Sequence, residues 1–93
     1  MSDISIKNKC VMKLRKISEY LNKRLQKAGL YPEINILNEK EISILIEWGD
    51  WKHEHGTLSY IMKEEGYRET NKVITEENGS DCYSAIHYFI KAV

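Results

Sequence analysis

Residues 34–51 read Ile-Asn-Ile-Leu-Asn-Glu-Lys-Glu-Ile-Ser-Ile-Leu-Ile-Glu-Trp-Gly-Asp-Trp and hold the densest β-branched and aromatic content of the chain. Apolar and polar residues alternate along most of this stretch, which is typical of strands that bury one face. The pattern predicts a β-hairpin that organises the rest of the fold. The apolar face of its second strand is predicted to hold Ile42, Ile44, Ile46 and Trp48.

The pairing of the two predicted strands follows from the apolar face. A connection over residues 38–40 places Ile36 opposite Ile42 and Ile34 opposite Ile44. A two-residue turn would instead place an asparagine amide on that face. Because register follows the buried face, we expect the longer connection.

The segment before the hairpin predicts a long helix over residues 5–28. Its apolar residues recur at steps of three and four, the period of a helix with one buried stripe. Gly29 follows where helices commonly end on a left-handed residue. The stripe comprises Cys10, Leu14, Ile17, Leu21, Leu25 and Ala28.

A second helix is predicted after the hairpin, over residues 51–65. Gly49 breaks the preceding strand, and Asp50 is a favourable N-cap residue. Gly56 costs a helix about 1 kcal/mol relative to alanine, so a start at Thr57 is the alternative. The apolar side of the helix is predicted to hold Trp51, His55, Leu58, Ile61 and Met62.

Residues 68–76 predict a third strand, and the sequence Glu-Asn-Gly at 77–79 predicts a turn into a fourth strand over 81–92. This turn sets Ile74 opposite Cys82. The last segment also fits a helical stripe, so a helix is the alternative there. That stripe would comprise Cys82, Ala85, Ile86, Phe89, Ile90 and Val93.

These segments predict a single α+β domain over residues 1–93. The expected element order is α-β-β-α-β-β, with a four-stranded antiparallel sheet and two helices packed on one of its faces. If the last segment is helical, the order becomes α-β-β-α-β-α. A chain of 93 residues is long enough to bury a core of its own.

The composition points to a cytoplasmic protein. The chain has no apolar run of transmembrane length, its N-terminus lacks the apolar core of a signal peptide, and it has only two cysteines. We therefore expect no contact with a membrane. The heavy use of Lys, Ile, Asn and Glu favours an AT-rich genome, such as that of a bacterium or a phage.

The net charge is zero, but the charges are unevenly distributed along the chain. Residues 1–32 carry eight Lys and Arg against two acidic residues, and residues 33–93 carry six against twelve. Such a division favours a dipolar surface. On the face of the first helix opposite its apolar stripe, Lys9, Lys13, Lys16, Lys23 and Lys27 recur at helical spacing. This basic face is the candidate for nucleic-acid contact.

Asp50, His53 and His55 form the one sequence cluster that suggests a metal site. Two histidines separated by one residue chelate a metal on a strand or loop, but on a helix their side chains diverge. Because a helix is predicted here, we expect no bound metal and no cofactor. Cys82 and His87 point to opposite faces of a strand and lie about 140° apart around a helix. Neither predicted conformation makes a catalytic dyad, so the sequence argues against an enzyme.

The candidate interface is the sheet face away from the helices. We expect this open face to carry Leu37, Leu45, Tyr83, His87 and Phe89. Exposed aromatic and aliphatic patches usually mark contact surfaces. The leading hypothesis is a small non-enzymatic protein-interaction module, such as a bacterial or phage regulator or inhibitor. It would dock its open face and acidic rim on a protein partner or on a second copy to form a dimer. The alternatives are nucleic-acid binding through the basic helix and metal binding at His53 and His55.

Overall fold

The computed structural model describes the backbone of residues 2–92 and the side chains of residues 14–92. It confirms the predicted order α-β-β-α-β-β, including a strand in the last segment. The elements are α1 (Ser2–Lys27), β1 (Glu33–Ile36), β2 (Glu41–Asp50), a π-helical turn η1 (Trp51–His55), α2 (Gly56–Glu64), β3 (Tyr67–Glu77) and β4 (Cys82–Lys91).

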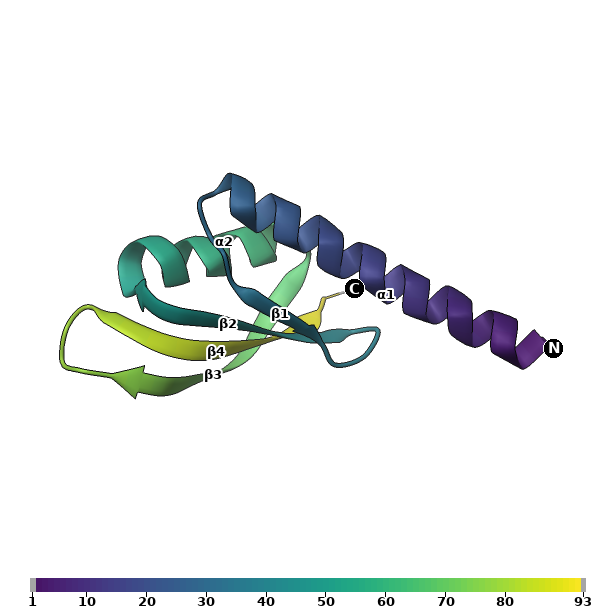
Figure 1. Ribbon diagram of the computed structural model, residues 1–93. Helices are drawn as coiled ribbons and strands as arrows, with labels where there is room; N and C mark the ends of the chain where they lie inside the picture. Colours follow the sequence, from purple (N-terminus) through teal and green to yellow (C-terminus); the bar gives the residue numbers. More distant parts are fainter. Residues whose placement is uncertain (1, 93) are drawn as a thin grey trace.

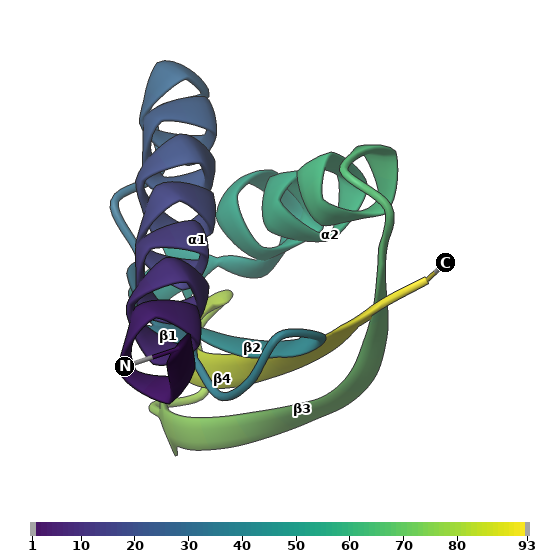
Figure 2. The same ribbon diagram turned by 90° about the vertical axis from the view of Figure 1, so that its right-hand side faces the viewer.

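The four strands form one antiparallel sheet in the order β1-β2-β4-β3. Both helices lie on the same face of this sheet, and the opposite face is left uncovered (Figures 1 and 2). This two-layer arrangement was predicted from the element order. No helix in the described part of the chain is long and apolar enough to cross a membrane.

The hairpin of β1 and β2 has the predicted register. Ile34 pairs with Ile44 and Ile36 pairs with Ile42. Asn38 closes the connection, because its side-chain oxygen accepts hydrogen bonds of 2.9 Å from the backbone N–H groups of residues 40 and 41. The apolar face and a local asparagine turn thus specify the same pairing.

Helix α1 ends at the glycine that the sequence indicated. Gly29 has a φ of 85°. The N–H of Leu30 donates to the carbonyl of Leu25 at 2.9 Å, and the N–H of Gly29 donates to the carbonyl of Gln26 at 3.0 Å. These two bonds form a Schellman motif, which turns the chain towards β1. At its other end α1 continues beyond the sheet, so the molecule measures 55 × 24 × 22 Å (Figure 1).

The core lies between the sheet and the two helices. Each helix contributes an apolar stripe, and the central strands contribute every second residue, as amphipathic packing requires. The side chain of Cys10, at the start of the predicted stripe of α1, lies outside the described side chains. The buried apolar residues are Leu21, Leu25, Leu30, Ile42, Ile44, Ile46, Leu58, Ile61, Met62, Tyr67, Ala85 and Phe89.

The predicted burial of Trp48 is wrong. β2 bulges between Ile46 and Gly49, where the register with β4 shifts. Trp48 takes up the extra position with a φ of 50°, and its side chain is 45% exposed. A bulge inserts a residue into one strand and breaks the alternation of faces. Trp51 in η1 is also exposed, contrary to the prediction.

The face of β4 that packs against the helices is not the one that we expected. His87 pairs with Ile44, and Phe89 pairs with Ile42. Directly paired residues share a face of the sheet, so both side chains lie on the helix side, where they are 1% and 2% exposed. The predicted exposure of His87 and Phe89 is therefore wrong, and Tyr83 is half-buried on the same side.

The pairing of β3 with β4 also differs from the prediction. Ile74 pairs with Ala85 rather than with Cys82. The connection, residues 78–81, is longer than the predicted turn, and the register also shifts within β3 between Ile74 and Glu76. In this connection the Asn78 side-chain oxygen accepts hydrogen bonds from the N–H and the Oγ of Ser80, at 3.1 and 2.6 Å. Within it Gly79 has the predicted left-handed conformation, with a φ of 84°.

Candidate functional site

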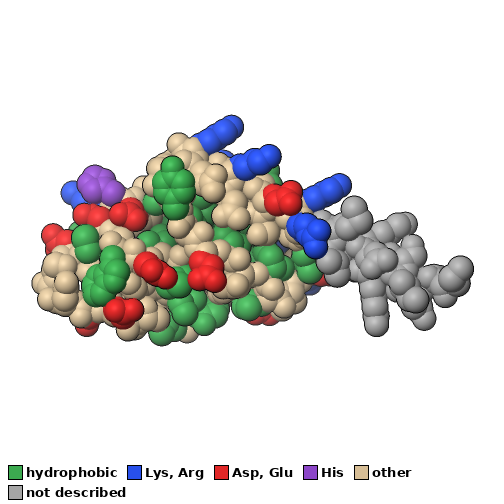
Figure 3. Space-filling model, in the orientation of Figure 1, with side chains coloured by type: hydrophobic (Ala, Val, Ile, Leu, Met, Phe, Trp, Pro, Cys, Tyr) green, Lys and Arg blue, Asp and Glu red, His purple; other side chains and the backbone are tan. Residues whose placement is uncertain are grey.

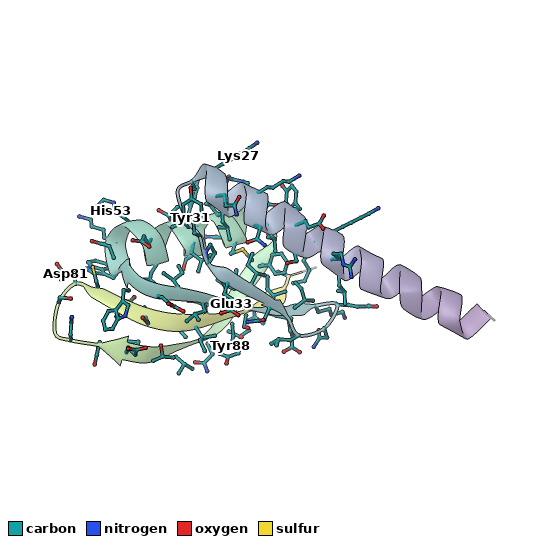
Figure 4. All side chains as sticks on the ribbon, in the orientation of Figure 1. Lys27, Tyr31, Glu33, His53, Asp81 and Tyr88 are labelled. Carbon is teal, nitrogen blue, oxygen red and sulfur yellow. The ribbon has the colours of Figure 1, made fainter. Side chains whose placement is uncertain are left out.

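The uncovered face of the sheet carries a contiguous apolar surface. Leu45 pairs with Ile86, and Ile86 also pairs with Val73, so these three side chains form one row across the strands. Tyr88 lies on the same face, away from the helices (Figure 4). A shallow hollow of about 300 Å³ beside it is lined in part by Leu37, Val73 and Tyr88. We call this surface the open face and define it by Leu37, Leu45, Val73, Ile86, Tyr88 and Ile90.

Glutamates flank the open face. Glu33 pairs with Leu45, Glu41 pairs with Ile90 and Glu76 pairs with Ser84, which places their side chains on this face. The one basic residue paired onto it in the described part of the sheet is Arg68, opposite Ile90. In the space-filling view, basic side chains follow α1, whereas acidic ones lie mainly over the strands and η1 (Figure 3). Glu47 is exposed and lines a hollow together with Glu33 and Leu45. We call Glu33, Glu41, Glu47 and Glu76 the acidic rim.

Two of the five predicted interface residues, Leu37 and Leu45, lie on this open face. The other three, Tyr83, His87 and Phe89, lie on the helix side of β4 and belong to the interior. Their places on the open face are taken by Ile86, Tyr88 and Ile90. The surface predicted from the sequence therefore exists, but β4 contributes its other set of side chains.

The basic face of α1 is only partly free of contacts within the chain. Lys16, Lys23 and Lys27 are exposed, and Lys27 points away from the sheet (Figure 4). Next to them, Arg24 forms ion pairs with Glu64 at 3.4 Å and Glu65 at 3.5 Å. The side chains of the other two predicted contacts, Lys9 and Lys13, lie outside the described side chains.

The structure does not bring the three metal candidates together. The Asp50 carboxylate caps η1 by accepting hydrogen bonds from the backbone N–H groups of Lys52 and His53, at 2.7 and 3.1 Å. His53 is exposed on the outer side of the turn (Figure 4), whereas His55 is buried. Among the described residues, no group of three or more His, Cys, Asp or Glu side chains is placed to hold a metal ion.

His55 instead belongs to a buried hydrogen-bonded chain that joins three elements. Its Nδ1 lies 2.8 Å from Nε2 of His87, and its Nε2 lies 3.1 Å from the carbonyl oxygen of Tyr83. On the other side of His87, Nδ1 lies 2.5 Å from Oε1 of Glu69. All four ring nitrogens therefore have a partner within the protein. We call Glu69, His87 and His55 the histidine chain.

Tyr83 and Lys72 cover the histidine chain. The Tyr83 ring stacks on that of His55, with 4.1 Å between ring centroids. The Lys72 ammonium lies 4.6 Å from the centre of the Tyr83 ring and donates a hydrogen bond to its hydroxyl. Beside these side chains is a pocket of about 140 Å³, which Trp51 and Ser59 also line.

The environment of the two histidines disfavours their charged forms. Burial lowers the pKa of His55, and the Lys72 charge acts in the same direction, while the Tyr83 carbonyl opposes it. Burial also lowers the pKa of His87, against the opposing effect of the Glu69 carboxylate. Uncharged imidazoles with both nitrogens engaged fit a structural role better than a nucleophilic one.

The sequence could not identify the histidine chain, because its members are far apart and lie on three different elements. The one available signal was the apolar setting of His55 on the buried side of the predicted second helix. Its partner His87 was assigned to the wrong face of β4, and nothing marked Glu69 in a strand of mostly polar residues.

The fold and the open face define a small two-layer α+β domain with one uncovered sheet face. No protein-family model matches this chain, and neither a curated protein nor a solved structure shows significant similarity to it.

Proposed function

We propose that the chain is a small non-enzymatic protein-interaction module that binds a protein partner through the open face. The observation that carries this proposal is the row of Leu45, Ile86 and Val73, which leaves apolar area uncovered at the centre of the sheet. Val73 remains 42% exposed there. A central apolar patch with a polar rim is the usual anatomy of a protein interface.

The acidic rim favours a partner with basic side chains around an apolar centre. Complementary charges at the rim of an interface speed association and suppress wrong partners. In a symmetric pair of identical chains, the same surface patch meets itself. Such a dimer would bring two acidic rims together, so we favour a different, basic protein over a second copy. A bacterial or phage regulator or inhibitor would use a surface of this kind.

A site-specific cross-linking experiment tests the proposal. The photoreactive residue p-benzoylphenylalanine replaces either Val73 on the open face or, as a control, Tyr60 on α2, which is exposed on the helix side. After irradiation in the source cells, we expect the Val73 position to capture a protein rich in Lys and Arg. The Tyr60 position should not capture that protein.

Charge reversal makes the same experiment specific for the acidic rim. Glu33→Lys combined with Glu47→Lys changes exposed residues and should remove the cross-link, while the thermal unfolding midpoint stays near that of the parent. Three results would contradict the proposal: capture only of a second copy of the chain, equal capture from Tyr60, or capture that ignores the charge reversal.

The second candidate function is nucleic-acid binding through α1. The observation in its favour is that Lys16, Lys23 and Lys27 are all exposed along one helical face. Binding through lysines to phosphates weakens steeply with salt. Fluorescence anisotropy with labelled duplex and single-stranded oligonucleotides should then show binding at low salt that Lys16→Glu with Lys23→Glu abolishes. No change in anisotropy with the parent protein would exclude this candidate.

A further inference from the structure

The histidine chain contains three contacts between polar atoms, and each contact requires one proton. Those contacts are Glu69 to His87, His87 to His55, and His55 to the Tyr83 carbonyl. A neutral imidazole carries one N–H, and a carboxylate carries none. Two neutral histidines and an ionised glutamate therefore supply two protons for three hydrogen bonds.

The Tyr83 carbonyl can only accept, so it fixes the tautomer of His55. Nε2 of His55 must therefore carry the proton of that contact, which leaves its Nδ1 as an acceptor. A neutral His87 has one N–H, so it donates either to this Nδ1 or to the Glu69 carboxylate. The other of its two contacts then lacks a proton.

We propose that Glu69, His87 and His55 form a single site that binds one proton from solvent, and that this proton lets His87 donate to Glu69 and to His55 at the same time. With the proton bound, all three contacts are hydrogen bonds, and an imidazolium paired with a carboxylate leaves the site without net charge. Without it, one of the two contacts of His87 holds no proton and is not a hydrogen bond.

The charged groups around the site set the pH at which the proton binds. Lys72 of β3 disfavours it, whereas Glu69 of β3 and Glu54 of η1 favour it. Burial and the Lys72 charge both lower the pKa of the two histidines, and together they outweigh the two carboxylates. The site therefore binds its proton below the ordinary pKa range of histidine. The proton therefore binds in mildly acidic solution.

This site is separate from the open face and does not depend on the proposed function. It lies on the helix side of the sheet and joins β3, β4 and η1 through side chains. Glu69 and Lys72 also line the pocket beside Trp51. Proton binding therefore changes the charge that this pocket presents, because it converts the neutral His87 imidazole into an imidazolium.

Imidazole ¹⁵N NMR spectroscopy of the intact chain tests the proposal directly. At neutral pH we expect both buried histidines to be uncharged, with His55 as the Nε2–H tautomer. On acidification, as long as the protein stays folded, the pair should take up one proton, at His87, while His55 stays neutral. His53 is exposed and lies outside the histidine chain, so its signals must be assigned separately. An Nδ1–H tautomer at His55, or a proton on each ring in the folded protein, would overturn the proposal.

Glu69→Gln supplies the matched variant. The amide of glutamine can donate to Nδ1 of His87, so the third hydrogen bond forms without a proton from solvent. We expect His87 in this variant to stay neutral across the pH range in which it titrates in the parent. His53→Gln, the control, should leave the parent titration unchanged. Equal titration of His87 in the parent and in Glu69→Gln would refute the one-proton site.

Discussion

The backbone N–H of Trp48 donates a hydrogen bond to the side-chain oxygen of Ser84, 2.8 Å away on the neighbouring strand. At this position β2 bulges, and Trp48 adopts a left-handed conformation with a φ of 50°. Its N–H is thus satisfied by a buried side chain instead of a strand carbonyl. Ser84 therefore helps to hold the backbone in a conformation that a residue with a β-carbon rarely adopts.

We expect the strain at Trp48 to be measurable with two variants that both remove the indole ring. Trp48→Gly removes the steric conflict of the left-handed conformation, whereas Trp48→Ala retains it. Because that conflict costs roughly 1–2 kcal/mol per residue, the glycine variant should have the higher free energy of unfolding, by about 1 kcal/mol. Urea denaturation measures the difference. Equal stability of the two variants would show that the bulge stores no strain at Trp48.

Gly49, the next residue, is predicted to tolerate no side chain. A β-carbon there would lie 2.5 Å from Cγ2 of Ile46 and 2.9 Å from Oε2 of Glu54. Gly49→Ala should therefore lower the free energy of unfolding by about 1–3 kcal/mol, the usual cost of overpacking.

Gly56→Ala is the matched control, because the new β-carbon would meet its nearest atom, the Trp51 carbonyl oxygen, at an ordinary 3.5 Å. Gly56 has helical torsion angles, so alanine should stabilise the protein by roughly 0.5–1 kcal/mol. Urea denaturation of both variants gives the comparison. If both substitutions changed the free energy of unfolding in the same direction, the close approach at Gly49 would not be the reason that glycine is required there.

The orientation of β4 makes a second pair of variants informative. Phe89 is 2% exposed, and Phe89→Ala should cost about 3–5 kcal/mol through lost burial and the cavity left behind. Val73 lies on the open face, and Val73→Ala should cost about 1 kcal/mol or less. Chemical denaturation of both variants tests the assignment. A larger loss for Val73 than for Phe89 would mean that β4 faces the other way.

Stability should fall as the pH is lowered through the range in which unfolded histidine takes up protons. The pKa values of His55 and His87 are both lowered in the folded protein, chiefly by burial. Below the ordinary histidine pKa of about 6.5, the unfolded chain therefore binds more protons than the folded one, even with one proton in the histidine chain. The free energy of unfolding then rises with pH across this range.

Urea denaturation at a series of pH values between neutral and mildly acidic measures this dependence. His53→Gln should retain the fall in stability on acidification, because His53 is exposed and lies outside the histidine chain. A protein that became more stable on acidification would contradict the expected sign.

The element order and the first hairpin could be predicted because their signals are local. The alternation over residues 34–51, the asparagine in the turn and Gly29 after α1 each act within a few residues of the structure that they specify. Asp50 likewise caps η1 as its sequence position indicated. Such signals need no knowledge of which segments meet in space.

The composition of the open face could not be predicted because both faces of β4 are apolar. Cys82, Ile86 and Ile90 alternate with Ala85 and Phe89, so the strand itself does not indicate which set is buried. Pairing with β2 decides this, and that pairing joins residues far apart in the chain. The bulge was missed for a related reason, since the apolar alternation continues through Trp48 without a break.

The strand order has a consequence for the synthesis of the chain. β4 lies between β2 and β3, yet it leaves the ribosome after both of them. Until it emerges, β2 has β1 as a partner on one edge only, and β3 has no strand to pair with. The nascent chain therefore holds unpaired strand edges and the uncovered apolar side chains of β2 until the last strand arrives. Such edges are sites of misassociation, so chaperone engagement should be concentrated in the interval before residues 82–91 emerge.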